Sequence, residues 1–134
     1  MALTDARIAT RLPAGDLERA RRWYADKLGL EPVEERPGGL RYVVGGAEFA
    51  VYQSGGRADG SFTQFAFTVT DVEAEVAELR ARGVVLEDYD LPGQDPDTGI
   101  VPIDGNYPSK GTGERAVWFR DSEGNMIGLS QPTR

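Results

Sequence analysis

The chain has 134 residues, contains no histidine and no cysteine, and carries a formal net charge of −7 at pH 7. The lack of imidazole and thiol groups excludes Ser-His-Asp and Cys-His catalysis, and zinc sites built from His or Cys ligands. The acidic balance argues against nucleic acids and anionic membranes as partners, and the length suits one domain or two small tandem modules.

Residues 16–29 predict an amphipathic helix in the first half of the chain. Asp16 is a favourable N-cap and Gly29 a favourable C-cap. The apolar residues on one face of this helix are Leu17, Ala20, Tyr24 and Leu28. Strands are expected on both sides of it, at residues 7–12, 32–36, 40–44 and 47–53.

After a Gly-rich polar linker at residues 54–61, the same pattern starts again. Asp71 repeats the N-cap role, and Gly83 closes the second helix. The apolar stripe of this helix is formed by Val72, Val76 and Leu79. Further strands are expected at residues 63–70, 84–89, 116–120 and 126–130. Residues 91–113 have no clear period, and a loop this long is usually functional or disordered.

The two halves align at an offset of 55 residues, where residues 16–18 match residues 71–73. Each half therefore reads β-α-β-β-β, and a repeated unit of this kind predicts two modules that complete one core. The strands lie too close together in sequence for a doubly wound parallel sheet, so we expect an α+β fold. The predicted single domain covers residues 1–134, with module 1 at about 1–54 and module 2 at about 62–134.

Two motifs carry a family resemblance that covers nearly the whole chain. Residues 16–24 read D-L-E-R-A-R-R-W-Y and are followed by K-L-G-L, while residues 121–125 read D-S-E-G-N. They resemble the opening motif and the last turn of the vicinal oxygen chelate superfamily, which includes glyoxalase I, the bleomycin-resistance proteins and the extradiol dioxygenases. The resemblance implies two βαβββ modules whose eight strands form a cupped, incomplete barrel. In the metal enzymes of this family, four ligands enter the cup from the first and fourth strand of each half.

The ligand positions that the resemblance assigns lack suitable donor atoms in this chain. They fall on Ala9 (or Ile8 after a one-residue insertion), near Ala50, and on Gln64 and Gly128. A register slip would bring in Glu48, but Glu48 and Gln64 alone make a poor site for a hard cation. We therefore expect no metal and no other cofactor.

Without a metal, the resemblance predicts a cup that accepts an organic guest. Its candidate lining consists of Gln64, Trp118, Tyr52, Met126 and Tyr107. Aromatic side chains with a few polar groups make a reasonable small-molecule site. The alternative is that the aromatic residues and Met126 are simply core, and that Gln64 is a hydrogen-bonded structural residue. Tyr107 lies in the Gly-rich stretch around residues 105–113, which is a candidate lid.

Three functional hypotheses follow. The first is a metal-free protein that binds a small molecule, as bleomycin-resistance proteins do, with no catalytic residues and an aromatic or cationic ligand. The second is a divergent enzyme, a lyase, isomerase or dioxygenase-like protein, with Glu48, Tyr107 and Lys110 as candidates. The third is an accessory domain with no ligand. Convergence of Glu48 and Gln64 in the cup would favour the enzyme.

The remaining expectations concern partners and compartment. The resemblance makes a homodimer the default assembly. The N-terminal residues have no apolar signal core, and no segment approaches the roughly 20 apolar residues of a membrane span. A chain without cysteine suits the reducing cytoplasm.

Overall fold

The computed structural model describes residues 3–105 and 111–133. Module 1 begins with a 3-10 turn, η1 (Leu3–Asp5), and then follows the predicted order. Its elements are β1 (Thr10–Ala14), α1 (Leu17–Leu28), β2 (Glu34–Arg36), β3 (Gly39–Val44) and β4 (Ala47–Gln53). The strands form one sheet in the order β1-β4-β3-β2, hereafter sheet 1, in which only the β1–β4 pair is parallel.

Module 2 repeats this arrangement. Its elements are β5 (Thr63–Thr68), α2 (Val72–Ala81), β6 (Val101–Asp104), β7 (Gly113–Arg120) and β8 (Met126–Thr133). They form sheet 2 in the order β5-β8-β7-β6, again with a parallel pair between the first and last strands of the module. The predicted α+β fold of two tandem βαβββ modules is confirmed.

The predicted caps explain where both helices begin. The Asp16 carboxylate accepts from the backbone N–H of Arg19 at 3.0 Å, and the Asp71 carboxylate accepts from Ala74 N–H at 3.1 Å. Each cap thereby satisfies a donor that the first turn of a helix leaves without an intrahelical partner. Gly29 ends α1 with a left-handed φ of 68°, as expected for a glycine C-cap.

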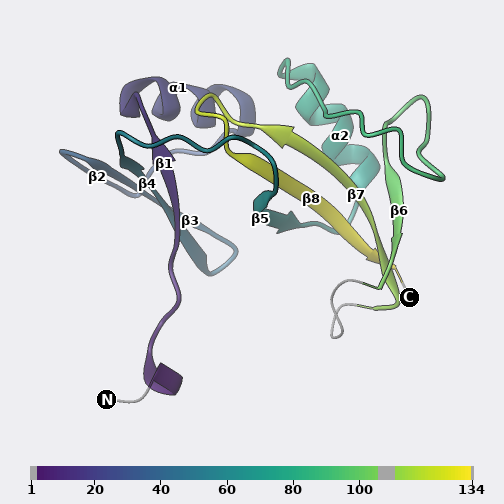
Figure 1. Cartoon of the computed structure of the whole chain (residues 1–134), viewed down its shortest axis with the longest axis horizontal. Coiled ribbons are helices and arrows are strands. Elements are labelled where there is room, and N and C mark those ends of the chain that lie inside the picture. The colour runs from purple at the N-terminus through teal and green to yellow at the C-terminus, as the bar shows by residue number, and fades with distance from the viewer. Residues whose placement is uncertain (1–2, 106–110, 134) are drawn as a thin grey trace.

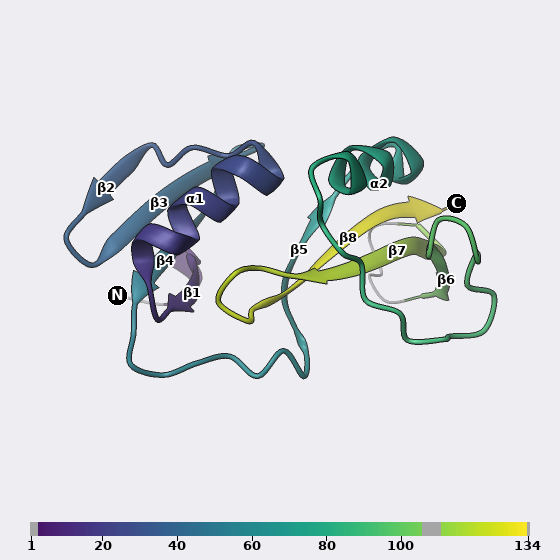
Figure 2. The same cartoon turned by 90° about the horizontal axis from the view of Figure 1, so that it is seen from above.

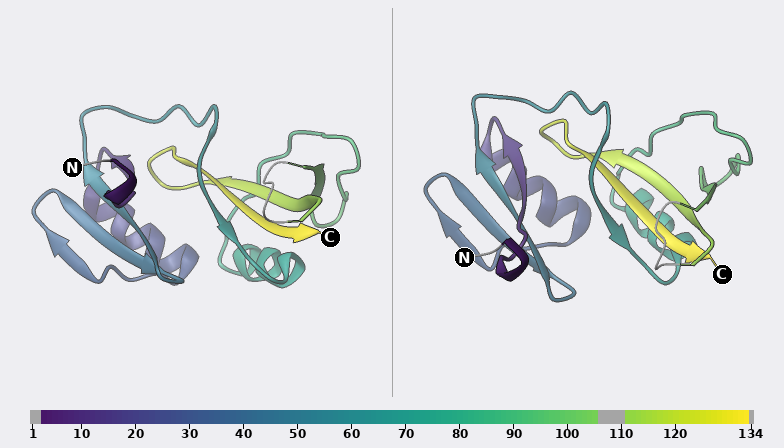
Figure 3. Two further views of the ribbon diagram at one scale, coloured as in Figure 1. Left: turned by 90° about the horizontal axis from the view of Figure 1, so that it is seen from below. Right: turned by 60° about the horizontal axis from the view of Figure 1, so that its bottom comes forward.

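Each sheet packs one face against its helix, and both helices lie on the same side of the two sheets (Figure 1, Figure 2). Along β4, Phe49 and Val51 are buried in the core, while Ala50 and Tyr52 alternate onto the opposite face. We call this opposite face of each sheet its cup face. Seen from below, the sheets lie in front of the helices (Figure 3).

The β7–β8 turn, residues 121–125, joins module 2 to module 1. The buried Asp121 carboxylate accepts from the Tyr24 hydroxyl at 2.7 Å and from the Asn125 side-chain amide at 2.8 Å. The same amide donates to the carbonyl of Pro13 at 3.0 Å. The Arg19 guanidinium holds both oxygens of Glu123, at 2.8 and 2.9 Å. This motif, recognised in the sequence as a strand connection, is therefore the polar joint between the modules.

The helix ends make a second, reciprocal contact between the modules. Lys27 donates to the carbonyl of Arg82, a residue 55 positions later, and Arg82 donates to the carbonyl of Asp26. The spacing equals the repeat offset, so equivalent positions of the two helices meet at the module boundary. Apolar contacts complete the junction, including Phe49 against Phe65, with ring centroids 4.9 Å apart.

Three strand predictions need correction. The expected strand at residues 84–89 is wrong, because this segment makes only an isolated bridge between Leu86 and Phe119. The second strand of the module is instead β6, inside the predicted loop at 91–113. Pro102 argued against a strand in this part of the sequence, but β6 lies at the edge of sheet 2, where proline is tolerated. The first strand starts at Thr10 rather than residue 7 and continues to Ala14.

Candidate functional site

The cup face of sheet 2 contains a pocket of about 250 Å³. Strand alternation places its β7 and β8 side chains on one face, because Ala116 lies opposite Ser130 and Trp118 lies opposite Gly128. The described residues that line it are Thr63, Ala66, Glu114, Ala116, Trp118, Gly128, Leu129 and Ser130. Its walls come from three neighbouring strands of one module.

Small residues on adjacent strands form the floor of this pocket. A Cβ added at Gly128 would lie 3.3 Å from the side chains of Ala66 and Thr63 and 3.5 Å from Trp118 Cδ1. Real Cβ atoms rarely approach neighbours at 3.3 Å, so any larger residue here would push Trp118 or β5 outward. Gly128 thus lets the Trp118 indole lie close to the floor.

An aromatic wall borders the pocket. Tyr89 packs edge-to-face on Trp118, with ring centroids 5.6 Å apart, and its hydroxyl lies 3.6 Å from the Met126 sulfur. Partial burial, together with the neighbouring Glu87 carboxylate, raises the pKa of Tyr89 above its ordinary value. Arg120 donates to Glu87 at 3.0 Å.

The five candidate lining residues are not all brought together. Trp118 and Met126 share the aromatic wall through Tyr89. Gln64 lies at an irregularity of β5, between Thr63 paired with Met126 and Phe65 paired with Ile127. Among the described β5 residues, Thr63 and Ala66 line the pocket.

The other two candidates lie elsewhere. Tyr52 is on the cup face of sheet 1, where it is 38% exposed. Residues 106–110 of the candidate lid, Tyr107 among them, lie outside the described residues.

Sequence reasoning missed Tyr89 and Glu114. Tyr89 was assigned to a strand that does not form, so its contact with Trp118 had no sequence signal. Glu114 would have been found by extending the predicted strand at 116–120 back to Gly113. Alternation then places Glu114, Ala116 and Trp118 on one face.

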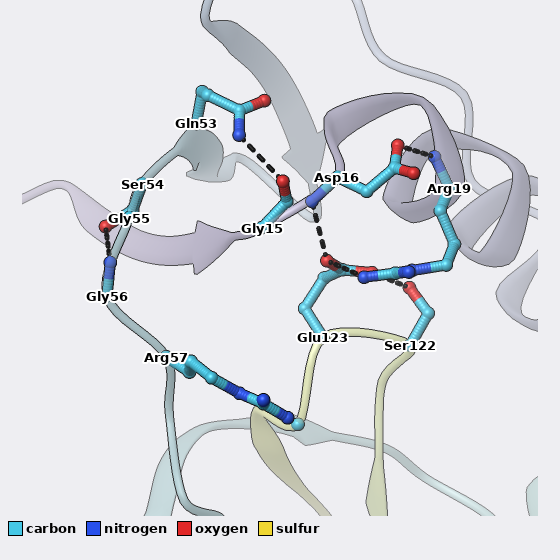
Figure 4. Close-up of a pocket in the computed structure, with 11 residues that line it drawn as sticks. Gly15, Asp16, Arg19, Gln53, Ser54, Gly55, Gly56, Arg57, Ser122 and Glu123 are labelled. Carbon is cyan, nitrogen blue, oxygen red and sulfur yellow. Dashed lines mark hydrogen bonds and ion pairs between the residues drawn. The ribbon is translucent and has the colours of Figure 1, made fainter.

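A larger hollow, about 860 Å³, lies at the module junction near the start of α1 (Figure 4). Its charged groups largely satisfy one another, since Arg19 and the Asp16 backbone N–H both donate to Glu123. The hydrogen bonds from Arg19 lower the pKa of Glu123 to about 2, because their effect is larger than the opposing effect of burial, which raises it. We interpret this hollow as the open side of the module joint, because Asp16, Arg19 and Glu123 already have structural partners.

Comparison with known proteins identifies the family. Residues 7–129 match the model of the Glyoxalase/Bleomycin resistance protein/Dioxygenase superfamily. The chain belongs to this superfamily. The comparison with curated proteins gives no match.

Several solved structures share the fold of this chain. A member from Alicyclobacillus acidocaldarius has a TM-score of 0.70 at 15% identity, covering 100% of this chain and 96% of that one. TnmS3, an antibiotic binding protein from Streptomyces sp. CB03234, has a TM-score of 0.64 at 25% identity, covering 96% and 97%. Virulence protein STM3117 from Salmonella typhimurium has a TM-score of 0.68 at 20% identity, covering 96% and 98%.

The residues at the superfamily's metal-ligand positions do not fit a metal. Ala50 and Gly128 offer no side-chain donor, and Ala9 lies before β1. Glu48 is on the cup face of sheet 1, where Arg41 donates to it at 3.0 Å. Across residues 3–105 and 111–133, no three Asp or Glu side chains gather as a metal site.

The two helices of this chain are short, with 12 residues in α1 and 10 in α2. Within the described part of the chain, no helix has the length and apolar character needed to span a membrane.

Proposed function

We propose that the protein binds a small organic molecule, aromatic or cationic, without the help of a metal. The observation that carries this proposal is the pocket on the cup face of sheet 2, in which Trp118 stands over a floor of Ala66, Ala116 and Gly128. A concave site with an aromatic wall and few polar groups is typical of small-molecule binding. The similarity to TnmS3, an antibiotic binding protein, supports the same function.

The arrangement of carboxylates favours binding over catalysis. Glu48, the acid expected in a metal-dependent cup, is engaged by Arg41 on the other sheet. Gln64 does not line the pocket that contains Trp118. Paired acids with separated pKa values are the usual sign of acid–base chemistry, and Gln64 is an amide that cannot act as the second acid beside Glu48.

The proposal includes a homodimer that acts in the reducing cytoplasm. The cup face of sheet 1 exposes Val43 and Tyr52, and the segment before β1, which extends away from the sheets in Figure 1, exposes Leu3 and Ile8. Apolar groups of this kind are typical of a surface that a partner covers. We infer that the cup face of sheet 1 in one copy closes the pocket of the other. Sedimentation equilibrium should give twice the monomer mass, and a monomer at all concentrations would contradict the dimer.

Two tryptophans allow a specific test of the pocket. The chain contains Trp23 and Trp118 as its only tryptophans, and Trp23 lies on α1, stacked on Phe119. In a Trp23→Phe variant, the remaining fluorescence therefore comes from Trp118. A thermal-shift screen of aromatic and cationic natural products supplies the ligands, and each ligand should quench Trp118 as it saturates the pocket.

The matched control is Trp118→Phe, which keeps Trp23 as the reporter and should show no quenching on ligand addition. Trp118→Ala should weaken binding of the same ligands at least about tenfold, because it removes an aromatic surface worth about 1.5 kcal/mol or more. Unchanged affinity in Trp118→Ala would place the ligand elsewhere.

Metal analysis tests the second part of the proposal. Purified protein should contain far less than one equivalent of Ni, Zn, Mn or Fe, and a chelator should leave its melting temperature unchanged. One tightly held equivalent, with a lower melting temperature after chelation, would overturn the metal-independent function.

A further inference from the structure

A second cavity lies on the helix side of the molecule, where α1 and α2 flank the boundary between the modules (Figure 2). Its volume is about 240 Å³, and we call it the interhelix groove. Phe119 lines it and is buried, and this residue follows Trp118 on β7. Because successive strand residues face opposite sides of a sheet, the groove and the pocket beside Trp118 lie on opposite faces of sheet 2.

The walls of the groove are apolar, drawn from both modules and incompletely covered. Five of its apolar lining residues pack against the core but are only half-buried: Leu28, Leu30, Val44, Phe67 and Val69. Apolar side chains left half-buried in a concave site favour an apolar occupant. The boundary between two structural units is also a common place for a small-molecule site.

The size of the groove limits what can fill it. A single helical turn, about 10 Å across and about 5.4 Å long, already needs more space than the groove offers. An apolar cavity of about 150 Å³ is sufficient to bind benzene. A methylene group occupies nearly the volume of one water molecule, ~30 Å³, so the groove has room for a chain of roughly eight carbons.

Charged side chains border the groove, but none of them requires a charge from a ligand. Arg82 donates to the Glu78 carboxylate at 2.8 Å, and Lys27 donates to the backbone carbonyl of Arg82 at 2.9 Å. Glu75, also on the rim, is exposed to water. An ionic ligand would lose part of its hydration on entering, and this loss would not be offset. The rim therefore favours an uncharged molecule.

We propose that the interhelix groove is a second ligand site, which binds an uncharged aliphatic molecule of roughly eight carbons. The site goes beyond the proposed function, because it lies on the other face of sheet 2 from Trp118. The carbon chain packs on Phe119 at the bottom, between Leu28 of module 1 and Val69 of module 2. Since it contacts both modules, the bound molecule stabilises the junction between them.

The first test measures how affinity depends on chain length and charge. Isothermal titration of the full chain with 1-butanol, 1-hexanol and 1-octanol should show affinity rising about fourfold for each added methylene group. From 1-octanol to 1-decanol the gain should fall below about twofold, because the additional carbons stay in water. Octanoate and octylammonium should each bind at least about threefold more weakly than 1-octanol. An undiminished gain up to 1-decanol, or tighter binding of either ion, would overturn the proposal.

The second test fills the groove from either module. Val69→Phe should weaken 1-octanol binding at least about tenfold, because the ring takes the place of several ligand carbons. Val44→Phe fills the groove from module 1 and decides the question if Val69→Phe does not fold, which melting temperatures show. Val85→Phe is the matched control, since Val85 is 83% exposed and lies outside the groove, and its affinity should be unchanged. Wild-type affinity in either folded groove variant, or a tenfold loss in Val85→Phe, would overturn the site.

Failure of this inference is distinguishable from failure of the proposed function. Loss of 1-octanol binding in Trp118→Ala, with full binding in Val69→Phe, would place the alcohol in the pocket on sheet 2 and overturn the groove as its site. The quenching of Trp118 by aromatic ligands decides separately whether that pocket binds small molecules.

Discussion

The two modules share one strand order but present very different cup faces. On sheet 1, Arg41 lies at the surface in ion pairs with Glu34 and Glu48, and Tyr52 is exposed. On sheet 2, the equivalent face contains the pocket and buries Met126, Gly128 and Ser130 of β8. Duplication of a βαβββ unit therefore supplies two similar frameworks, and only local differences decide which of them encloses a pocket.

Connection length is the main local difference. In module 1, residues 29–33 link the helix to the next strand, whereas residues 82–100 make the equivalent connection in module 2. The longer connection places Tyr89 against Trp118 and Met126. The turns differ as well, since a Cβ at Gly45 or Gly46 between β3 and β4 would meet no atom within 4 Å, while the β7–β8 turn reaches module 1.

The largest expected effect comes from breaking this turn. Asp121→Ala should lower the free energy of unfolding by about 3–5 kcal/mol, because it leaves the buried Tyr24 hydroxyl and Asn125 amide without their shared acceptor. Urea denaturation measures the loss. Asp104→Ala, at an exposed carboxylate of β6, is the control and should change stability by less than about 0.5 kcal/mol. Equal losses in the two variants would mean that the turn does not hold the modules together.

The same joint should make the free energy of unfolding depend on pH. Arg19 holds the pKa of Glu123 at about 2, below the ordinary 4.5, so the ionised form is the one that the fold stabilises. This contribution is complete above about pH 4.5 and is lost as the pH falls toward 2. Because Arg19 is half exposed and water screens the pair, we expect about 1–2 kcal/mol.

Denaturation curves across this pH range provide the measurement. Glu123→Gln should flatten the pH dependence of the unfolding free energy, while Glu75→Gln, at an exposed position of α2, should retain the wild-type slope. A Glu123→Gln protein that loses stability in acid as steeply as the wild type would rule out this residue as the source.

A smaller effect, on ligand affinity, is expected from substitution of Tyr52 on the cup face of sheet 1. If the cup face of one copy closes the pocket of the other, Tyr52→Ala should weaken ligand binding about threefold to tenfold. Titration of a ligand found by the thermal-shift screen measures this change. Tyr52→Phe keeps the ring and should bind normally. Unchanged affinity in Tyr52→Ala would confine the site to sheet 2.

The fold was predictable because its signals are local. Asp16 and Asp71 begin helices that repeat at a fixed offset, and the turn at residues 121–125 carries a recognisable motif. The candidate site was predicted only in part. Trp118 was assigned to the cup by the family resemblance and Met126 by strand alternation, and Trp118 lines the pocket whereas Met126 is not among the lining residues. Tyr89 contacts both side chains from an irregular segment whose path depends on tertiary contacts. An irregularity in β5 likewise changes which residues face the pocket, and periodicity alone does not indicate it.

The smallest expected effect is at Glu48, the acid of sheet 1 that most resembles Glu114 in its place on a cup face. Glu48→Gln removes the negative charge that pairs with Arg41, but both side chains are partly exposed, so the loss should be below about 0.5 kcal/mol and should shrink further in high salt. Urea denaturation at low and high salt measures it. A loss above about 1.5 kcal/mol that grows with protein concentration would contradict a wet surface pair. It would instead place Arg41 and Glu48 inside the dimer, where a second copy removes the water that screens them.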